Sequence, residues 1–287
     1  MTLLKILVLA IVQGAAELLP VSSSAHVIVV EKLMGLDPTR PEMTLLLVML
    51  HTGTMFAVIF FFWNSWRQNI FSSQKVFWDS VKLITIATVL TGIVGLLLKF
   101  LIERFILGDA SHAEIELLFG NLVLISAALA AVGLLIIFAG WKTRHSHDEK
   151  TSLDLKGACW IGALQGVCLP FRGFSRSGAT ISAGLLLGIV KTRVEEFSFA
   201  LVVVLTPPII VREALRLLRA HHSSLFDMTS MIGLFYPSLV GMVLSFISGI
   251  LALRLLSDWL ERGRWHLFGI YCLCASIVVF LLHWSGL

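Results

Sequence analysis

Six long apolar runs constrain the fold of this chain more than any other feature of its sequence. An α-helix needs about 20 apolar residues to cross the hydrocarbon core of a bilayer. Because 57% of the residues are apolar and only 14% are charged, a soluble enzyme, a disordered chain and a disulfide-stapled secreted domain are excluded. The sequence predicts an all-α polytopic membrane protein with about six transmembrane helices, at residues 44–63, 83–102, 117–140, 197–218, 229–253 and from 267 to the end.

Two further apolar segments, 6–36 and 158–190, are interrupted by proline, glycine, serine and charged residues. Both contain Gln-Gly, then Leu-Pro, then a serine-rich turn, and each is followed by three long runs. The two segments therefore indicate an internal repeat within one membrane domain; chance similarity of kinked helices is the alternative. Repeat 1 is expected at about 1–140, a cytoplasmic linker at about 141–157 and repeat 2 at about 158–287.

The distribution of lysine and arginine predicts how the chain is oriented. The loops 64–82 and 141–157 are rich in these residues, whereas Arg104 is the only one in 103–116. Since cytoplasmic loops carry an excess of lysine and arginine, the two rich loops are placed in the cytoplasm. The first interrupted segment then opens outward and the second inward, as two re-entrant helix pairs of an inverted-topology repeat. Such pairs typically form a site near the bilayer midplane.

The first interruption carries a carboxylate, a serine run and a histidine. Gln13 and Glu17 are four residues apart and share one helix face, and a carboxylate within an apolar segment is usually functional. The serine run follows Pro20 at the start of the next helix, where free backbone N–H groups attract anions. Ser23 and His26 are three residues apart, so we expect the imidazole to reach the hydroxyl as its base. Singly, a serine or a histidine is more often structural, but the combination of all four residues favours a catalytic site.

The second interruption carries an arginine where the first carries its serine run. Arg176 has a rigid fork of donors that suits phosphate oxygens. Neighbouring hydroxyl and backbone groups are expected to complete an oxyanion cradle. A loop whose arginines only set topology is the alternative, and the role of Arg172 is left open. The expected substrate-binding residues are Gln13, Ser22, Ser24, Ser175, Ser177, Gly178 and Thr180.

A hydroxyl, an imidazole, a carboxylate and a guanidinium together suit phosphoryl transfer from a substrate dissolved in the membrane. The phosphate charge also favours a divalent cation, Mg²⁺ or Ca²⁺. Glu17 and Gln13 are the predicted metal ligands because hard cations take oxygen ligands. The formal charge of +4 is attributed to the cytoplasmic loops and does not indicate nucleic-acid binding.

These residues resemble the motifs of the undecaprenyl-diphosphate phosphatase family, also called the bacitracin-resistance protein family. The first family motif, (Glu/Gln)-x-x-x-Glu and then Pro-Val-Ser-Ser-x-Gly-His, is similar to residues 13–17 and 20–26. The second, Pro-Gly-x-Ser-Arg-Ser-Gly-Ala-Thr, is similar to residues 173–180, and the Glu-Phe-Ser-Phe run of the family stands at 196–199.

Three departures from the family pattern concern local geometry. Ala25 replaces the glycine before the histidine, and the proline of the second motif is displaced to Pro170. The sequence His-Thr-Gly at 51–53 stands where Gln-Leu-Gly is expected.

The resemblance implies removal of the terminal phosphate of undecaprenyl diphosphate, which returns undecaprenyl phosphate to peptidoglycan synthesis and underlies bacitracin resistance. It also implies a cation-dependent site facing the periplasmic side of the bacterial inner membrane. Ser23 would be the nucleophile or its close support, His26 the base, Glu17 the metal or proton ligand and Arg176 the phosphate clamp. A Ser23 phospho-enzyme and a water activated by His26 both stay open, as do homodimerisation and prenyl-chain preference.

A transporter or flippase for a prenyl phosphate is the main alternative, because inverted repeats with broken helices are a transporter architecture. The histidine near the serine favours an enzyme, since phosphate binding alone needs no base. A phosphatase of the phosphatidic-acid type, with its Pro-Ser-Gly-His motif, matches less well because the chain has no Lys-x6-Arg-Pro run.

Overall fold

The computed structural model describes residues 2–37, 41–107, 119–144, 153–221 and 228–285, and the regular structure within these ranges is helical. One π-helical turn, Glu103–Leu107, follows α4. The helices are α1 (Leu3–Leu18), α2 (Ser23–Leu33), α3 (Pro41–Asn69), α4 (Gln74–Ile102), α5 (Leu122–Arg144), α6 (Leu155–Cys168), α7 (Arg176–Leu186), α8 (Lys191–His221), α9 (Met228–Glu261) and α10 (Trp265–Trp284).

Six of these helices, α3, α4, α5, α8, α9 and α10, are long and apolar enough to cross a membrane. They coincide with the six predicted runs, so the predicted fold class is confirmed. Most extend beyond the apolar run, because a helix satisfies its own backbone hydrogen bonds and continues into the polar region. The helix expected from 117 begins at Leu122; residues 108–118 and the centre of the expected linker, 145–152, lie outside the described residues.

The two interrupted segments form two pairs of short helices, α1–α2 and α6–α7. Pro20 and Pro170 each follow the C-cap residue of the first helix of their pair. Leu19 is extended, as proline favours for the residue before it, whereas Leu169 keeps helical dihedral angles. The second helix of each pair begins at a serine cap: Ser22 accepts from the N–H of Ala25, and Ser175 from the N–H of Gly178. A serine oxygen in this position replaces a missing helical acceptor.

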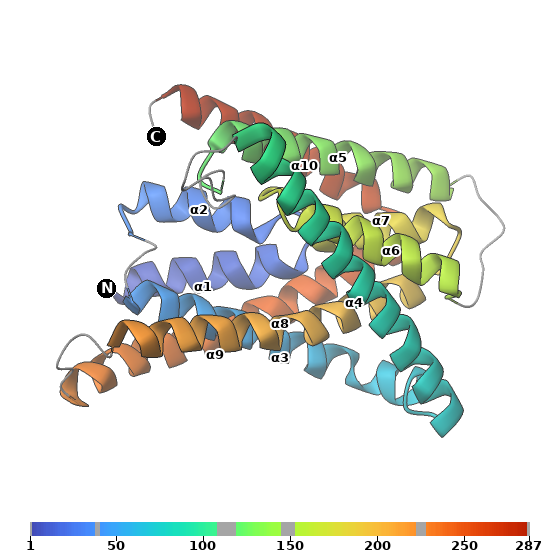
Figure 1. The fold of residues 1–287 in the computed structure, drawn as a ribbon, viewed down its shortest axis with the longest axis horizontal. Helices are drawn as coiled ribbons and strands as arrows, with labels where there is room; N and C mark the ends of the chain where they lie inside the picture. Colours follow the sequence, from blue (N-terminus) through green and yellow to red (C-terminus); the bar gives the residue numbers. More distant parts are fainter. Residues whose placement is uncertain (1, 38–40, 108–118, 145–152, 222–227, 286–287) are drawn as a thin grey trace.

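The two pairs enter the molecule from opposite ends. Figure 1 shows α1 beginning beside the N-terminus and α6 beginning at the far end, so that the two turns meet in the interior. Helices α5 and α10 pack together, and Ser126 and Ser276 each donate to the carbonyl oxygen of the other, at 3.0 and 2.8 Å. The entry of the two helix pairs from opposite ends is what an inverted repeat requires, but the repeat itself and its boundaries stay a prediction.

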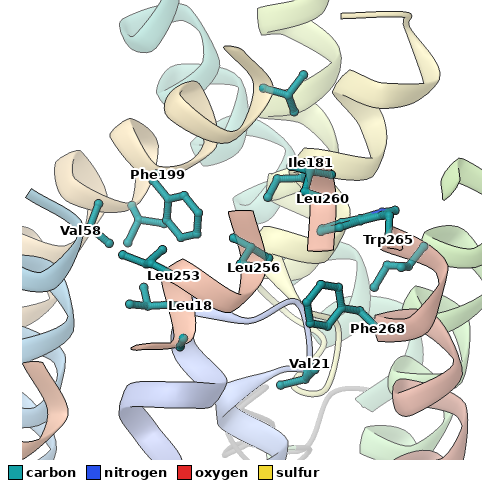
Figure 2. Packing of buried hydrophobic residues seen from close by; sticks show 14 of the residues in the cluster. Leu18, Val21, Val58, Ile181, Phe199, Leu253, Leu256, Leu260, Trp265 and Phe268 are labelled. Carbon is teal, nitrogen blue, oxygen red and sulfur yellow. The ribbon is translucent and has the colours of Figure 1, made fainter. Parts of the chain in front are cut away.

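A buried apolar cluster packs behind the first turn and fixes its position. Leu18 ends α1, Val21 lies in the turn, and both belong to the cluster shown in Figure 2. Ile181 of α7 and Phe199 of α8 belong to the same cluster, as do Leu253, Leu256 and Leu260 of α9 and Trp265 and Phe268 of α10. Within a bilayer, close packing rather than exclusion of water holds helices together, so this cluster joins both short pairs to the long helices.

Candidate functional site

The Glu17 carboxylate is the centre of a polar cluster that joins the two interrupted segments. Its side chain is only 4% exposed. Oε1 accepts a hydrogen bond from Arg176 Nη2 and forms an ion pair with it. Oε2 accepts from Ser23 Oγ at 2.5 Å and from Gln13 Nε2 at 3.2 Å. Four of the predicted site residues therefore lie together, as the sequence motifs indicated.

Two helix N-termini face this carboxylate. Ser23 is the first residue of α2 and Arg176 is the first residue of α7, and both side chains bond to Glu17. The N–H groups in the first turn of a helix have no intrahelical acceptor, and the helix dipole adds positive potential there. The site therefore combines a guanidinium with two helix starts, which is an arrangement suited to anionic oxygen atoms.

His26 does not pair with Ser23, which corrects the expected nucleophile–base contact. Its Nδ1 lies 2.8 Å from the carbonyl oxygen of Ser22, one helical turn back along α2. Its Nε2 lies 2.7 Å from the hydroxyl oxygen of Tyr271 on α10. Helical side chains tilt toward the N-terminus of their helix, which brings the ring onto this carbonyl. The Ser23 hydroxyl instead donates to Glu17, so the carboxylate is the group positioned to take its proton.

Two further residues at the site were not predicted. His51 on α3 places Nε2 3.9 Å from Glu17 Oε2, while its Nδ1 lies 2.8 Å from the carbonyl oxygen of Leu47. Tyr271 bonds to His26, and the two rings stack with centroids 5.7 Å apart. A histidine within an apolar span is itself a functional signal, so His51 could have been found from its position in the run 44–63. Tyr271 carries no comparable signal.

Two of the predicted cradle residues tie the two turns to each other. Ser24 Oγ accepts from the N–H of Gly173 at 3.3 Å. Ser177 Oγ donates to the carbonyl oxygen of Leu19 at 3.3 Å. These hydroxyl groups lie between the two half-sites, in the place expected for groups that contact a bound phosphate.

The remaining predicted cradle residues are engaged by the helix starts. Ser22 and Ser175 cap α2 and α7, and Gly178 donates its N–H to the second cap. Thr180 Oγ1 donates to the carbonyl oxygen of Arg176 at 2.8 Å and lies 2.6 Å from Ser198 Oγ on α8. A role of these groups in substrate binding stays a prediction. Their hydrogen bonds hold the starts of α2 and α7 in place, and these two helix starts form the site.

The Glu-Phe-Ser-Phe run connects helices, whereas Arg172 contacts the segment that precedes α5. The Arg172 guanidinium lies 4.4 Å from the centroid of the Phe119 ring. Glu196 accepts from Asn69 Nδ2 at 2.9 Å. Phe199 stacks on Phe62 with centroids 5.2 Å apart. The run therefore attaches α8 to α3, and Ser198 attaches it to α7.

The donor set for a divalent cation is narrow. Among the residues that the structure describes, no group of three or more histidine, cysteine, aspartate or glutamate side chains converges on a common point. Glu17 offers one carboxylate, and Gln13 offers a carbonyl oxygen beside the amide that donates to Glu17. Mg²⁺ is commonly held by one or two carboxylates together with substrate phosphates and water. The set therefore fits a cation that is completed by substrate and does not fit a structural ion held by protein alone.

Comparison with known proteins finds one matching family and relatives that are similar over nearly the whole chain. Residues 6–278 match the family described as "Bacitracin resistance protein BacA". The chain is 56% identical over 283 residues to "Undecaprenyl-diphosphatase 2" of Acinetobacter baylyi, covering 98% of both chains. It is 34% identical over 301 residues to "Undecaprenyl-diphosphatase 2" of Burkholderia orbicola, covering 99% of this chain and 97% of the relative. Both interrupted segments and five of the six candidate spans lie within residues 6–278, and the sixth span, Trp265–Trp284, begins within them and ends beyond.

Proposed function

The chain belongs to the bacitracin resistance protein BacA family, and on this basis we propose that it hydrolyses undecaprenyl diphosphate to undecaprenyl phosphate and inorganic phosphate. The names of its relatives support this substrate. The observation that carries the proposal is the convergence of Ser23 and Arg176 on the buried carboxylate of Glu17. A nucleophile, its base and a phosphate clamp are thereby brought together from two distant segments.

Substrate binding uses the donors that surround Glu17. The Arg176 side chain is 26% exposed, and a guanidinium has more donors than one carboxylate can occupy. The terminal phosphate binds to this fork and to the N–H groups at the starts of α2 and α7. The same donors then stabilise the negative charge of the transition state, which is the main source of catalysis in phosphoryl transfer.

In the first chemical step, Ser23 Oγ attacks the terminal phosphorus and Glu17 Oε2 takes the hydroxyl proton. The bond between that phosphorus and the bridging oxygen breaks, and undecaprenyl phosphate leaves with the electron pair. In the second step, water attacks the phosphoserine and its proton passes to His26. The bond from phosphorus to Ser23 Oγ breaks, and Ser23 regains its proton from Glu17. Inorganic phosphate is released.

A divalent cation, Mg²⁺ or Ca²⁺, is proposed to bind to oxygen atoms of Glu17 and Gln13. The substrate diphosphate would supply the ligands that the protein does not provide. Bound there, the cation would supply positive charge against the phosphate oxygens. Both residues lie on α1, and the hydrogen bond from Gln13 Nε2 to Glu17 Oε2 orients the amide.

The proposed location is the bacterial inner membrane, with the site accessible from the periplasmic side. Six candidate spans support a multi-pass membrane protein. The orientation rests on the lysine- and arginine-rich stretches 64–82 and 141–157, which are expected to face the cytoplasm. The first of them consists of the end of α3, the short turn after it and the start of α4. Labelling of single cysteines placed in these two stretches with a membrane-impermeant reagent tests the orientation, because the proposal expects no labelling in intact cells.

Phosphate release by the purified protein tests the function directly. The wild type should release phosphate from C55 or C15 prenyl diphosphate, and Arg176→Ala should abolish release. Arg262→Ala is the matched control, because the Arg262 side chain is 60% exposed, follows the last residue of α9 and pairs with Asp258 in the last turn of that helix. Full turnover by Arg176→Ala would contradict the assignment of the clamp.

A prenyl-phosphate transporter is the second candidate, favoured by the entry of α1 and α6 from opposite ends of the molecule (Figure 1), which is a transporter-like arrangement. Such a protein would move labelled prenyl phosphate across liposome membranes without releasing phosphate. The contact between Ser23 and Glu17 favours the phosphatase, because binding alone does not need an activated hydroxyl.

A further inference from the structure

Tyr271 brings α10 to the site through two successive residues. Its hydroxyl oxygen lies 2.7 Å from His26 Nε2, and its ring stacks on the imidazole. The adjacent Cys272 donates from Sγ to the carbonyl oxygen of Pro20 at 3.3 Å. Tyr271 is 47% exposed, so the hydroxyl is not enclosed by packing on every side. The hydrogen bond to His26 therefore links an accessible hydroxyl to the catalytic turn.

The two hydrogen bonds of His26 determine which ring nitrogen can act as a base. The carbonyl oxygen of Ser22 can only accept, so Nδ1 of His26 carries a proton. In the neutral ring the lone pair is then on Nε2. The hydroxyl of Tyr271 is the donor that faces this lone pair. A proton that reaches Nε2 therefore comes from this hydroxyl or arrives after the hydroxyl has moved away.

We propose that Tyr271 is a further catalytic residue, which relays the proton of the attacking water to His26; this inference rests on the proposed phosphatase function. A hydroxyl oxygen can accept one proton while it donates another. The water oxygen bonds to phosphorus, the water proton moves to the Tyr271 oxygen, and the original hydroxyl proton moves to Nε2. Tyr271 is neutral before and after the step, and His26 becomes an imidazolium that later returns the proton to phosphate.

The relay is tested by removing only the hydroxyl. Tyr271→Phe keeps the ring that stacks on His26 but has no donor for Nε2. We expect kcat to fall on the order of a hundredfold, as for loss of a general acid–base group, with KM unchanged. Tyr236→Phe is the matched control, since Tyr236 is the other tyrosine of the chain, lies on α9 and is 70% exposed. Its kinetic constants should equal those of the wild type.

A second measurement does not depend on the variant. The ¹⁵N resonances of His26, assigned by their loss in His26→Asn, should report a protonated Nδ1 and an unprotonated Nε2 in the wild type without substrate. The opposite tautomer would overturn the relay even if Tyr271→Phe does not fold. An active wild type with an equally active Tyr271→Phe, or a variant changed only in KM, would also overturn it. A wild type that releases no phosphate overturns the phosphatase function itself.

Discussion

Arg176 and Glu17 are 159 positions apart in the sequence and form a direct ion pair. One belongs to the second interrupted segment and the other to the first, so the pair closes the site across the two halves of the chain. The carboxylate is almost completely buried, and its charge is compensated by the guanidinium. Arg176 is therefore already bonded to Glu17 before phosphate binds. When phosphate binds, the N–H donors of Arg176 must be shared between the Glu17 carboxylate and the phosphate.

Loss of Arg176 should destabilise the protein as well as inactivate it. Arg176→Gln leaves the buried Glu17 carboxylate without its counter-ion, a change that typically costs about 3–5 kcal/mol of unfolding free energy. The double variant Glu17→Gln/Arg176→Gln removes both charges and should recover part of that loss. Unfolding in detergent measures both variants, with Arg262→Gln as the exposed control. A double variant no more stable than Arg176→Gln would contradict the cost assigned to the unpaired Glu17 carboxylate.

Substitutions of Ser23 and of His26 should block the reaction at different chemical steps. Ser23→Ala removes the attacking oxygen, and we expect turnover to fall by roughly a thousandfold or more. His26→Ala leaves Ser23 and Glu17 in contact but removes the base for water, so phosphoserine should accumulate. Mass spectrometry of the quenched enzyme detects the added phosphate. Ser72→Ala, in an exposed turn, should behave as wild type. An unmodified His26→Ala enzyme that has consumed substrate would favour direct attack by water.

Removal of divalent cations should stop turnover without unfolding the protein. The described residues provide one carboxylate and one amide at the site, so the cation contributes with substrate rather than to the fold. A chelator should abolish phosphate release, and added Mg²⁺ should restore it, while the unfolding temperature stays the same. Gln13→Ala should raise the Mg²⁺ concentration needed for half-maximal activity. Undiminished turnover in excess chelator would exclude the proposed cation.

The architecture could be predicted because its signals are long and local. Each candidate span is an apolar run, and Pro20 and Pro170 mark the interruptions in the sequence itself. Glu17, Ser23 and Arg176 could be chosen because charged and hydroxyl residues are conspicuous in apolar segments. Their meeting was inferred from the repeated pattern, and the contacts of Glu17 are consistent with that inference.

Contacts between separate helices could not be predicted in the same way. The spacing of Ser23 and His26 allowed their contact, but the carbonyl oxygen of Ser22 and the hydroxyl of Tyr271 compete for the imidazole. Spacing within a helix describes which residues share a face, whereas the partner of each polar atom depends on which helix packs beside it. His51 could be suspected from its position in an apolar span, but its approach to Glu17 depends on the packing of α3. Tyr271 likewise reaches His26 through the packing of α10, which no local pattern encodes.

The contact between α6 and α4 should be sensitive to a single methyl group. A Cβ at Gly162 would lie 2.4 Å from the carbonyl oxygen of Ala87 and 2.6 Å from its Cα. Backbone atoms cannot turn aside, so Gly162→Ala must separate the helices and break the 2.9 Å hydrogen bond from Thr91 Oγ1 to the Gly162 carbonyl oxygen. Overpacking of this kind costs about 1–3 kcal/mol of unfolding free energy. Because α6 packs against α7, which begins at Arg176, displacement of α6 should also move Arg176 and lower turnover.

Gly92 on α4 is the matched control for this substitution, because a Cβ there would meet nothing within 4 Å. Alanine is the better helix former by about 1 kcal/mol, so Gly92→Ala should unfold at the same temperature as the wild type or slightly higher. Thermal unfolding and phosphate release, measured on both variants in the same detergent, give the comparison. If Gly162→Ala were as stable and active as Gly92→Ala, the close approach of α6 to α4 could not be what holds Arg176 against Glu17.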